Sequence, residues 1–249
     1  MSELVFLGTG NFLAPPGRYW NSFVLDGHVL VEPSPTALPN LRRCGFAVDA
    51  IDVVVLSHFH ADHCFGWPFL LEAAAEIGNG RTLWVVGPPG VEEWLVGLNR
   101  AGAVDGVTEM ARQRLDLRFV DASEGLADGV WQEAGPLRFR AVEVDHVPYL
   151  RCFGYLFERD EGFVVAYSGD VKPCAGLSEL ARSSEVLVLE CNGRHDGPVS
   201  HMHEENVLEL SAEYPELRII VTHLGEQVVV ERLVKAGVTV PSDFERLKV

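Results

Sequence analysis

The sequence predicts an α/β fold in which helices pack on β-sheets, and two observations carry this prediction. Short runs of β-branched and aliphatic residues alternate with helix-like stretches along the whole chain, with Gly and Pro between them. The chain has 249 residues, of which 47% are hydrophobic, and no change of composition marks a linker. Because strands and helices are mixed over the whole length, we expect layered packing and one domain over residues 1–249.

The expected strands are short apolar runs bounded by turn residues. In chain order they cover residues 4–7, 22–25, 29–31, 53–56, 83–86, 137–144, 155–158, 163–167, 186–189 and 219–221. Longer stretches between them indicate helices over residues 35–44, 68–76, 91–102, 202–213 and 228–236. This order of elements is typical of sheets whose outer faces are covered by helices.

Composition and charge argue against several classes of protein. The net charge of −16 repels polyanions, so extended nucleic acid is a disfavoured partner. The first residues lack a basic flank before their apolar run, and no segment approaches the roughly 18 apolar residues of a membrane span. We therefore expect a cytoplasmic protein with no membrane partner. Five cysteines without a C-x-x-C pair argue against a disulfide framework and against a thiolate zinc site.

Residues of metal-ligand type stand at the C-terminal ends of several predicted strands. The segment IDVVVLSHFHADH runs from a strand into the cluster His58, His60, Asp62 and His63. In the same way FRAVEVDH ends on His146, FVVAYSGD on Asp170, LRIIVTH on His223 and EVLVLE on Glu190. Loops at these strand ends converge in α/β proteins, so we expect the side chains to form one shared site.

The spacing within the first cluster indicates metal binding. His58 and His60 stand at i and i+2, which lets both imidazoles face one centre, and Asp62 and His63 then face a second. Imidazole and carboxylate suit zinc-like divalent metals. The alternative for any single histidine is a polar turn residue on an exposed loop, but the combined pattern HxHxDH favours a metal site.

These motifs together resemble a known family. SHFHADH, followed by His146, YSGD and VTHLG, is similar to the metallo-β-lactamase fold of metal-dependent hydrolases. VFLGTG, ALPNLRRCGF and VVGPPGVEEWL resemble its ribonuclease Z-like branch. The resemblance covers nearly the whole chain and implies a four-layer αββα sandwich with the metals at one edge of the two sheets. It also implies two divalent metal ions as cofactors, with zinc expected and manganese or iron as alternatives.

The resemblance assigns the ligands residue by residue. It implies that one ion is held by His58, His60 and His146, the other by Asp62, His63 and His223, and that Asp170 bridges both. Two ions placed in this way lower the pKa of a bridging water and hold a hydroxide ready for attack.

The same resemblance indicates the catalytic residues. His201 precedes a predicted helix, at the place where the ribonuclease Z-like branch has a histidine that assists the leaving group. We expect it to pair with Glu190, whose charge favours a protonated imidazole, whereas the nearby helix N-terminus disfavours one. Asp62 is a third expected catalytic residue, in addition to its place at the metals. His203 and His195 stay open as alternatives to His201, as does a purely helix-capping role for His201.

The sequence therefore predicts a dinuclear metal-dependent hydrolase and favours phosphodiester cleavage, where a departing alkoxide needs an acid. Between Gly90 and His146 there is no Gly/Pro-rich basic arm of the kind that clamps tRNA in ribonuclease Z. This favours a small phosphodiester or an RNA end as the substrate. Acyl hydrolysis of a thioester, a lactone or a glyoxalase-type substrate is the alternative, followed by a non-enzymatic metal-binding role. Many members of the family dimerise, so a homodimer is also left open.

Overall fold

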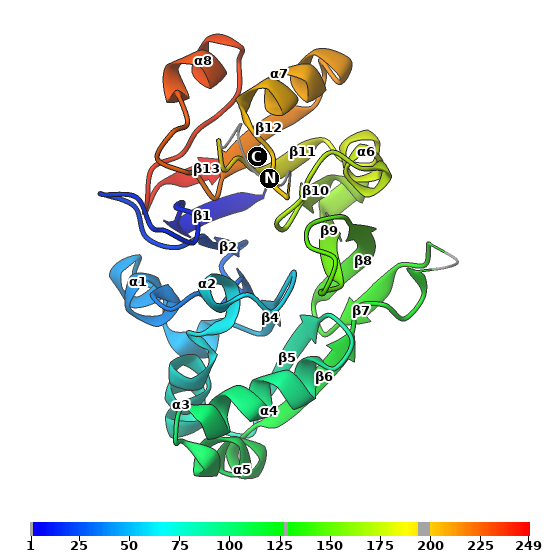
Figure 1. The fold of residues 1–249 in the computed structure, drawn as a ribbon. Helices are drawn as coiled ribbons and strands as arrows, with labels where there is room; N and C mark the ends of the chain where they lie inside the picture. The colour runs from blue at the N-terminus through cyan, green and yellow to red at the C-terminus, as the bar shows by residue number, and fades with distance from the viewer. Residues whose placement is uncertain (1, 127–128, 194–199) are drawn as a thin grey trace.

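The computed structural model describes residues 2–126, 129–193 and 200–249, and two β-sheets form its centre (Figure 1). The first sheet runs in the order β13-β1-β2-β3-β4-β5-β6. Its strands are β13 (Arg246–Lys248), β1 (Glu3–Gly8), β2 (Ser22–Leu25), β3 (Val29–Val31), β4 (Val53–Val55), β5 (Thr82–Gly87) and β6 (Asp116–Asp121). The pairs β13·β1, β1·β2 and β2·β3 are antiparallel, whereas β3, β4, β5 and β6 run parallel.

The second sheet runs in the order β12-β11-β10-β9-β8-β7. Its strands are β12 (Arg218–Thr222), β11 (Val186–Glu190), β10 (Val164–Tyr167), β9 (Cys152–Glu158), β8 (Leu137–Val144) and β7 (Gln132–Ala134). Here β10, β11 and β12 are parallel, and β9 pairs antiparallel with both β8 and β10. The parallel strands of both sheets end at the edge that carries the predicted ligands.

Helices form the connections between parallel strands, as parallel pairing requires. On the first sheet these are α1 (Ala37–Arg43), α2 (Ala61–Cys64), α3 (Trp67–Ile77), α4 (Val91–Ala101) and α5 (Asp105–Arg114), with a 3-10 turn at Val48–Ala50. On the second they are α6 (Ala175–Arg182) and α7 (Glu204–Glu213), followed by α8 (Val230–Lys235), with a 3-10 turn at Asp160–Gly162. Figure 1 shows the two groups of helices on opposite sides of the paired sheets.

Side-chain alternation along the strands builds three layers of core. On β1, Val5 and Leu7 pack toward α1 and α3, whereas Leu4 and Phe6 pack between the two sheets. Alternate residues of a strand point to opposite faces, so one apolar strand supplies both layers. The inter-sheet layer is rich in buried aromatic residues such as Phe139. A third layer lies between the second sheet and α6, α7 and α8. The predicted αββα sandwich is therefore confirmed.

Every strand and helix expected from the sequence corresponds to an observed element, but several observed elements were missed. The missed strands are β6, β7 and β13, and the missed helices are α2, α5 and α6. β6 has the sequence DLRFVD and β13 has RLK, and charged residues on such edge strands hide the apolar alternation. α5 reads DGVTEMARQR, whose polar residues weaken the apolar stripe of a helix. Within the described residues, every helix is too short or too polar to cross a membrane.

Candidate metal centre

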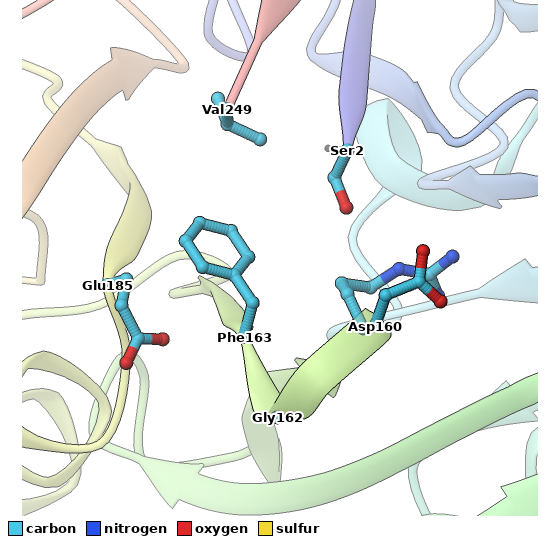
Figure 2. A pocket seen from close by; sticks show the side chains of 7 residues that line it. Ser2, Asp160, Gly162, Phe163, Glu185 and Val249 are labelled. Atoms are coloured by element: carbon cyan, nitrogen blue, oxygen red, sulfur yellow. The ribbon is translucent and has the colours of Figure 1, made fainter.

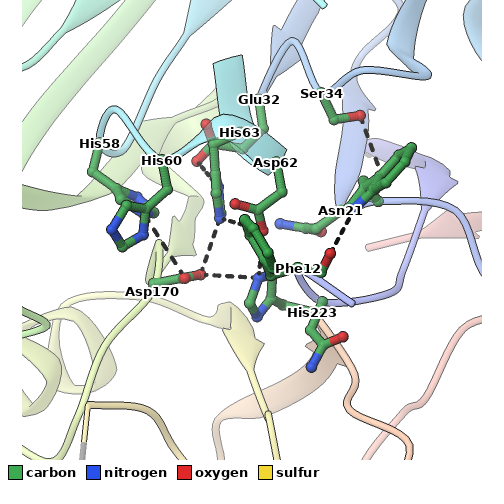
Figure 3. Close-up of polar contacts among 12 residues, drawn as sticks. Phe12, Asn21, Glu32, Ser34, His58, His60, Asp62, His63, Asp170 and His223 are labelled. Atoms are coloured by element: carbon green, nitrogen blue, oxygen red, sulfur yellow. Dashed lines mark hydrogen bonds and ion pairs between the residues drawn. The ribbon is translucent and has the colours of Figure 1, made fainter. Parts of the chain in front are cut away.

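The predicted ligands come together at one edge of the sandwich, where strands end. Figure 3 shows His58, His60, Asp62, His63, Asp170 and His223. β4 ends at Val55 and leads into His58 and His60, while Asp62 and His63 lie in α2 immediately after them. His146 follows β8, Asp170 follows β10 and His223 follows β12. Six of these seven side chains are buried and His60 is half-buried, so one edge collects ligands from both sheets.

The first group consists of His58, His60, His146 and Asp170, whose ligand atoms all lie within 4.8 Å of one another. Nε2 of His58 lies 3.0 Å from Nδ1 of His60, and Nε2 of His146 lies 3.4 Å from the same Nδ1. Oδ2 of Asp170 lies 3.8 Å from Nε2 of both His58 and His146. These atoms surround one point, which is the arrangement of a single coordination sphere.

The second group consists of Asp62, His63 and His223, again with ligand atoms within 4.8 Å of one another. Oδ2 of Asp62 lies 3.2 Å from Nε2 of His223 and 3.3 Å from Nε2 of His63. Oδ1 of Asp170 lies 3.4 Å from each of these two nitrogens. Asp170 thus turns one carboxylate oxygen toward each group.

Buried atoms without partners test whether divalent cations fit here. Among the described residues, Oδ1 of Asp62, Oδ1 of Asp170 and Nε2 of His63 are buried and lack a hydrogen-bond partner. Buried polar atoms in native proteins are almost always paired, so these atoms call for a ligand. Histidine nitrogen and carboxylate oxygen are the donors that zinc and similar ions take, and the site therefore fits two divalent cations.

Some of the ring nitrogens that face away from the two centres have hydrogen-bond partners, whereas Nδ1 of His63 and Nδ1 of His223 have none among the described residues. Nδ1 of His58 lies 2.9 Å from Oγ of Ser57, and Nδ1 of His146 lies 2.6 Å from the carbonyl oxygen of Ser200. Such outer partners fix the tautomer and orientation of a ligating imidazole.

One further hydrogen-bond partner, Tyr149, and one charged neighbour, Glu32, come from more distant residues. Nε2 of His60 lies 3.3 Å from the hydroxyl oxygen of Tyr149, and Nδ1 of His63 lies 3.4 Å from Oε1 of Glu32. Sequence reasoning missed both residues. Glu32 directly follows the apolar strand β3, which is the same strand-end signal that identified the ligands.

Burial and neighbouring charges shift the pKa values of the ligands. Burial lowers the pKa of His63, but the charges of Asp62 and Asp170 outweigh it and hold that pKa well above its usual value, whereas the pKa values of other ligands are lowered. Burial, with the charge of His63 adding to it, holds the pKa of His58 well below its usual value. Burial also lowers the pKa of His146 to about 4. Both imidazoles are therefore neutral near pH 7, as metal ligands must be. Burial alone would raise the pKa of Asp62, but the adjacent His63 and His223 hold it well below its usual value.

His201 lies beside both ligand groups and pairs with Glu190. Its Nδ1 lies 2.7 Å from Oε1 of Glu190 and 3.9 Å from Oδ2 of Asp170. Its ring centroid is 4.7 Å from that of His146 and 5.7 Å from that of His223. Burial lowers the pKa of His201, but the charge and hydrogen bond of Glu190 outweigh it and raise the pKa to about 9.

The alternatives to His201 have other positions. His203 is the N-cap residue of α7 and forms a capping box with Asn206. Its Nδ1 lies 3.2 Å from Oε2 of Glu205. The cap of this helix is therefore His203 and not His201. His195 lies outside the described residues.

A separate cavity of about 540 Å³ lies at the opposite end of the strands, near both chain ends (Figure 2). Its lining includes Phe163, Asp160 and Glu185, together with Arg159. The guanidinium of Arg159 already forms an ion pair with Asp26. This lining has no counterpart to the histidines of the two ligand groups, so the chemistry described above belongs to the other edge.

Comparison with known proteins agrees with this geometry. The family described as "Beta-lactamase superfamily domain" matches residues 28–224, which is most of the chain. The protein therefore belongs to the beta-lactamase superfamily. Its particular relatives include the ribonuclease Z of Methanosarcina mazei, which is 24% identical over 279 residues, covering 91% of this chain and 88% of that protein.

Two further relatives differ in how much of each chain they share. Ribonuclease Z 1 of Schizosaccharomyces pombe is 24% identical over 192 residues, which is 73% of this chain but only 24% of that longer protein. The crystal structure of a diphosphatase from the PhnP family superposes with a TM-score of 0.78 at 20% identity, covering 100% of this chain and 98% of that one. The expected superfamily and the likeness to ribonuclease Z are confirmed.

Proposed function

We propose that this protein is a two-metal hydrolase that cleaves the phosphodiester bond of a small substrate or of an RNA end. The observation that carries the proposal is His201, an imidazole whose pKa is raised to about 9 and whose Nδ1 lies 3.9 Å from the Asp170 carboxylate. A protonated group beside the two ligand groups is placed to act as an acid in bond cleavage.

The proposed division of ligands follows the distances between the side chains in the structure. His58, His60 and His146 would hold one ion, Asp62, His63 and His223 the other, and Asp170 would contact both. When bound, two divalent ions lower the pKa of a water nucleophile and offset the negative charge of a phosphoryl group. We propose zinc for both ions, because three of the four residues in the first group are imidazoles. Manganese or iron would fit the same donors.

His201 would donate its proton from Nε2. Its Nδ1–H is engaged by Glu190 at 2.7 Å, which leaves the Nε2–H free to reach the leaving oxygen. After that transfer, the neutral ring keeps its Nδ1–H bond to Glu190. Oε1 of Glu190 also accepts the backbone N–H of Val171 at 3.0 Å, so the carboxylate is held in place from one residue beyond Asp170. Asp62 would contribute to catalysis as a ligand that holds the second ion in place.

Leaving-group chemistry favours a phosphodiester over an acyl substrate. A departing alkoxide is a strong base and needs a proton, which His201 can supply. The name of one relative, ribonuclease Z, supports a phosphodiester bond, and the name of another, a diphosphatase, supports hydrolysis at phosphorus more generally. The net charge of −16 disfavours long polyanions. In addition, the polar helix α5 packs against α3 and α4 instead of extending from the body as a clamp. These features support a short substrate.

The first test measures cleavage of bis(p-nitrophenyl) phosphate by zinc-loaded and manganese-loaded protein, with a thioester and a lactone in parallel. We expect metal-dependent diester turnover that exceeds acyl turnover. A His201→Ala variant is compared on this activated diester and on one with an alkyl leaving group, where the loss should be much larger because the alkoxide needs the acid. Cleavage of the thioester or the lactone without cleavage of the diester would show that the protein is an acyl hydrolase instead. Full metal loading with no turnover on any substrate would favour a non-enzymatic role.

A further inference from the structure

A buried acid lies directly behind the second ligand group. Glu32 is 0% exposed, and its backbone has a φ of 59°, which is uncommon for a residue other than glycine. Its carboxylate accepts the backbone N–H of Ser57, at 3.2 Å to Oε1, and lies 3.4 Å from Nδ1 of His63 (Figure 3). A buried charge is costly unless several partners compensate it, so the surroundings of Glu32 have to supply them.

Those partners form a chain of hydrogen bonds that runs under the site. Burial raises the pKa of the Tyr167 phenol well above its usual value, and the charges of Glu32 and Asp170, together with a hydrogen bond to Glu32, raise it further. The Tyr167 hydroxyl oxygen accepts a bond of 2.9 Å from Nδ2 of Asn21. Oδ1 of Asn21 in turn accepts a bond of 2.7 Å from the Thr222 hydroxyl. All four side chains are buried. We call Glu32, Tyr167, Asn21 and Thr222 the Glu32 chain.

The Glu32 chain touches the second ligand group at two places. At one end the carboxylate faces the Nδ1 of His63. At the other end Thr222 directly precedes His223, whose backbone φ is 51°. A residue held in the left-handed region persists only where its surroundings determine the conformation, and the bond from Thr222 to Asn21 fixes the residue next to it.

The first ligand group is supported in a different way. Its described outer partners are neutral oxygens, from the Ser57 hydroxyl, the Ser200 carbonyl and the Tyr149 hydroxyl. An anionic partner stabilises a proton on the facing nitrogen and makes the other nitrogen a stronger ligand. In His63 the Glu32 charge, 3.4 Å from Nδ1, favours a proton on that nitrogen, although Nδ1 makes no hydrogen bond to any described residue. Nε2, the atom that faces Asp62 and Asp170, is then left to a cation.

We infer that the Glu32 chain positions the ligands of the second metal ion and sets the affinity of that site. Its link to the first group is the N–H of Ser57, whose hydroxyl faces His58, and Glu32→Gln keeps an oxygen to accept that N–H. The inference rests on the proposed two-metal centre. None of its four residues needs to touch the substrate, so each is a positioning residue. Removing the charge of Glu32 or the hydroxyl of Tyr167 should weaken the binding of one ion, by about 10-fold to 100-fold, the effect expected from loss of an outer partner.

The test compares Glu32→Gln and Tyr167→Phe with Tyr155→Phe as a matched control. Tyr155 lies in the same inter-sheet core, is also fully buried, and donates its hydroxyl to the Leu56 carbonyl at 2.7 Å. Each Tyr→Phe change thus removes one buried phenol hydroxyl. Zinc bound per chain is measured by mass spectrometry over a series of buffered free zinc concentrations, and thermal unfolding of each metal-free variant is recorded alongside.

We expect wild-type protein and Tyr155→Phe to take up two zinc ions with the same affinities. In Tyr167→Phe and Glu32→Gln, one of the two binding steps should move to at least 10-fold higher free zinc while the other stays in place. Two unchanged steps in Tyr167→Phe, or an equal shift in Tyr155→Phe, would overturn the inference and leave the proposed function standing. Wild-type protein that binds fewer than two zinc ions would instead refute the two-metal centre itself.

Discussion

Replacing Glu190 with Gln should move the alkaline limb of the pH–rate profile to lower pH. In the proposed mechanism the active form carries a protonated His201, so the rate falls as that imidazole loses its proton. The Glu190 carboxylate, 2.7 Å from Nδ1, is the strongest influence that keeps the proton in place. The amide of Gln keeps the shape of the side chain but removes the charge.

The size of the effect follows from the pKa values. The pKa of His201 is raised to about 9, although burial by itself lowers it. Without the Glu190 charge, burial is opposed chiefly by Asp170, and the pKa should return to about 6.5 or below. At pH 8 the protonated fraction then drops from about 90% to about 3%, a loss of about 30-fold in turnover. Bound cations lower the pKa of His201 in wild type and in Glu190→Gln alike. The quantity to measure is therefore the difference in pH between the alkaline limbs of these two proteins.

The assay records kcat/KM between pH 5 and 10 on a diester with an alkyl leaving group, for wild type, Glu190→Gln and a control, Glu205→Gln. Glu205 faces His203 at 3.2 Å on the same segment and thus offers a second histidine–carboxylate pair outside the proposed chemistry. The control should keep the wild-type limb. If the limb of Glu190→Gln coincides with that of wild type on this substrate, His201 is not the acid that Glu190 controls.

Three further outcomes follow from the geometry. Asp170→Asn should reduce bound zinc below two ions per chain and diester turnover by more than about 100-fold, since an amide cannot offer an anionic oxygen to both groups. Two zinc ions still bound per chain, counted by mass spectrometry, would contradict this. Gly169→Ala should lower the free energy of unfolding by more than about 1 kcal/mol and weaken zinc binding, because φ at this position is 59° and a new Cβ would lie 2.7 Å from Cβ of Ser57. A variant that unfolds in urea at the wild-type midpoint would refute this prediction. Phe139→Ala should cost about 3–5 kcal/mol in urea unfolding while two zinc ions per chain are retained, because Phe139 fills the inter-sheet layer away from the ligands.

The ligands could be predicted from the sequence because they follow predicted strands. A strand that is buried on both faces must be a continuous apolar run, so its end is visible as the first polar residue after the run. Asp170 and His223 stand out for this reason, because each follows the buried run of β10 or β12 within three residues. β8 before His146 instead alternates buried and exposed residues, and the spacing of His58 and His60 is a separate signal. Charged edge strands such as β6 (DLRFVD) give no such signal and were missed.

The local sequence pattern therefore determined which residues are candidate metal ligands and which strands they follow, because alternation and strand ends are properties of neighbouring residues. The family resemblance had already implied that Asp170 contacts both ligand groups, and the pairing of His201 with Glu190 was an expectation. The tertiary structure added the distances, one oxygen of Asp170 toward each group and 2.7 Å from Glu190 to His201, and the size of the rise in the pKa of His201. It alone brought Glu32 behind His63, from 31 positions earlier in the chain. Distances, burial and charge at this site arise where two sheets meet, and they depend on contacts between residues far apart in sequence.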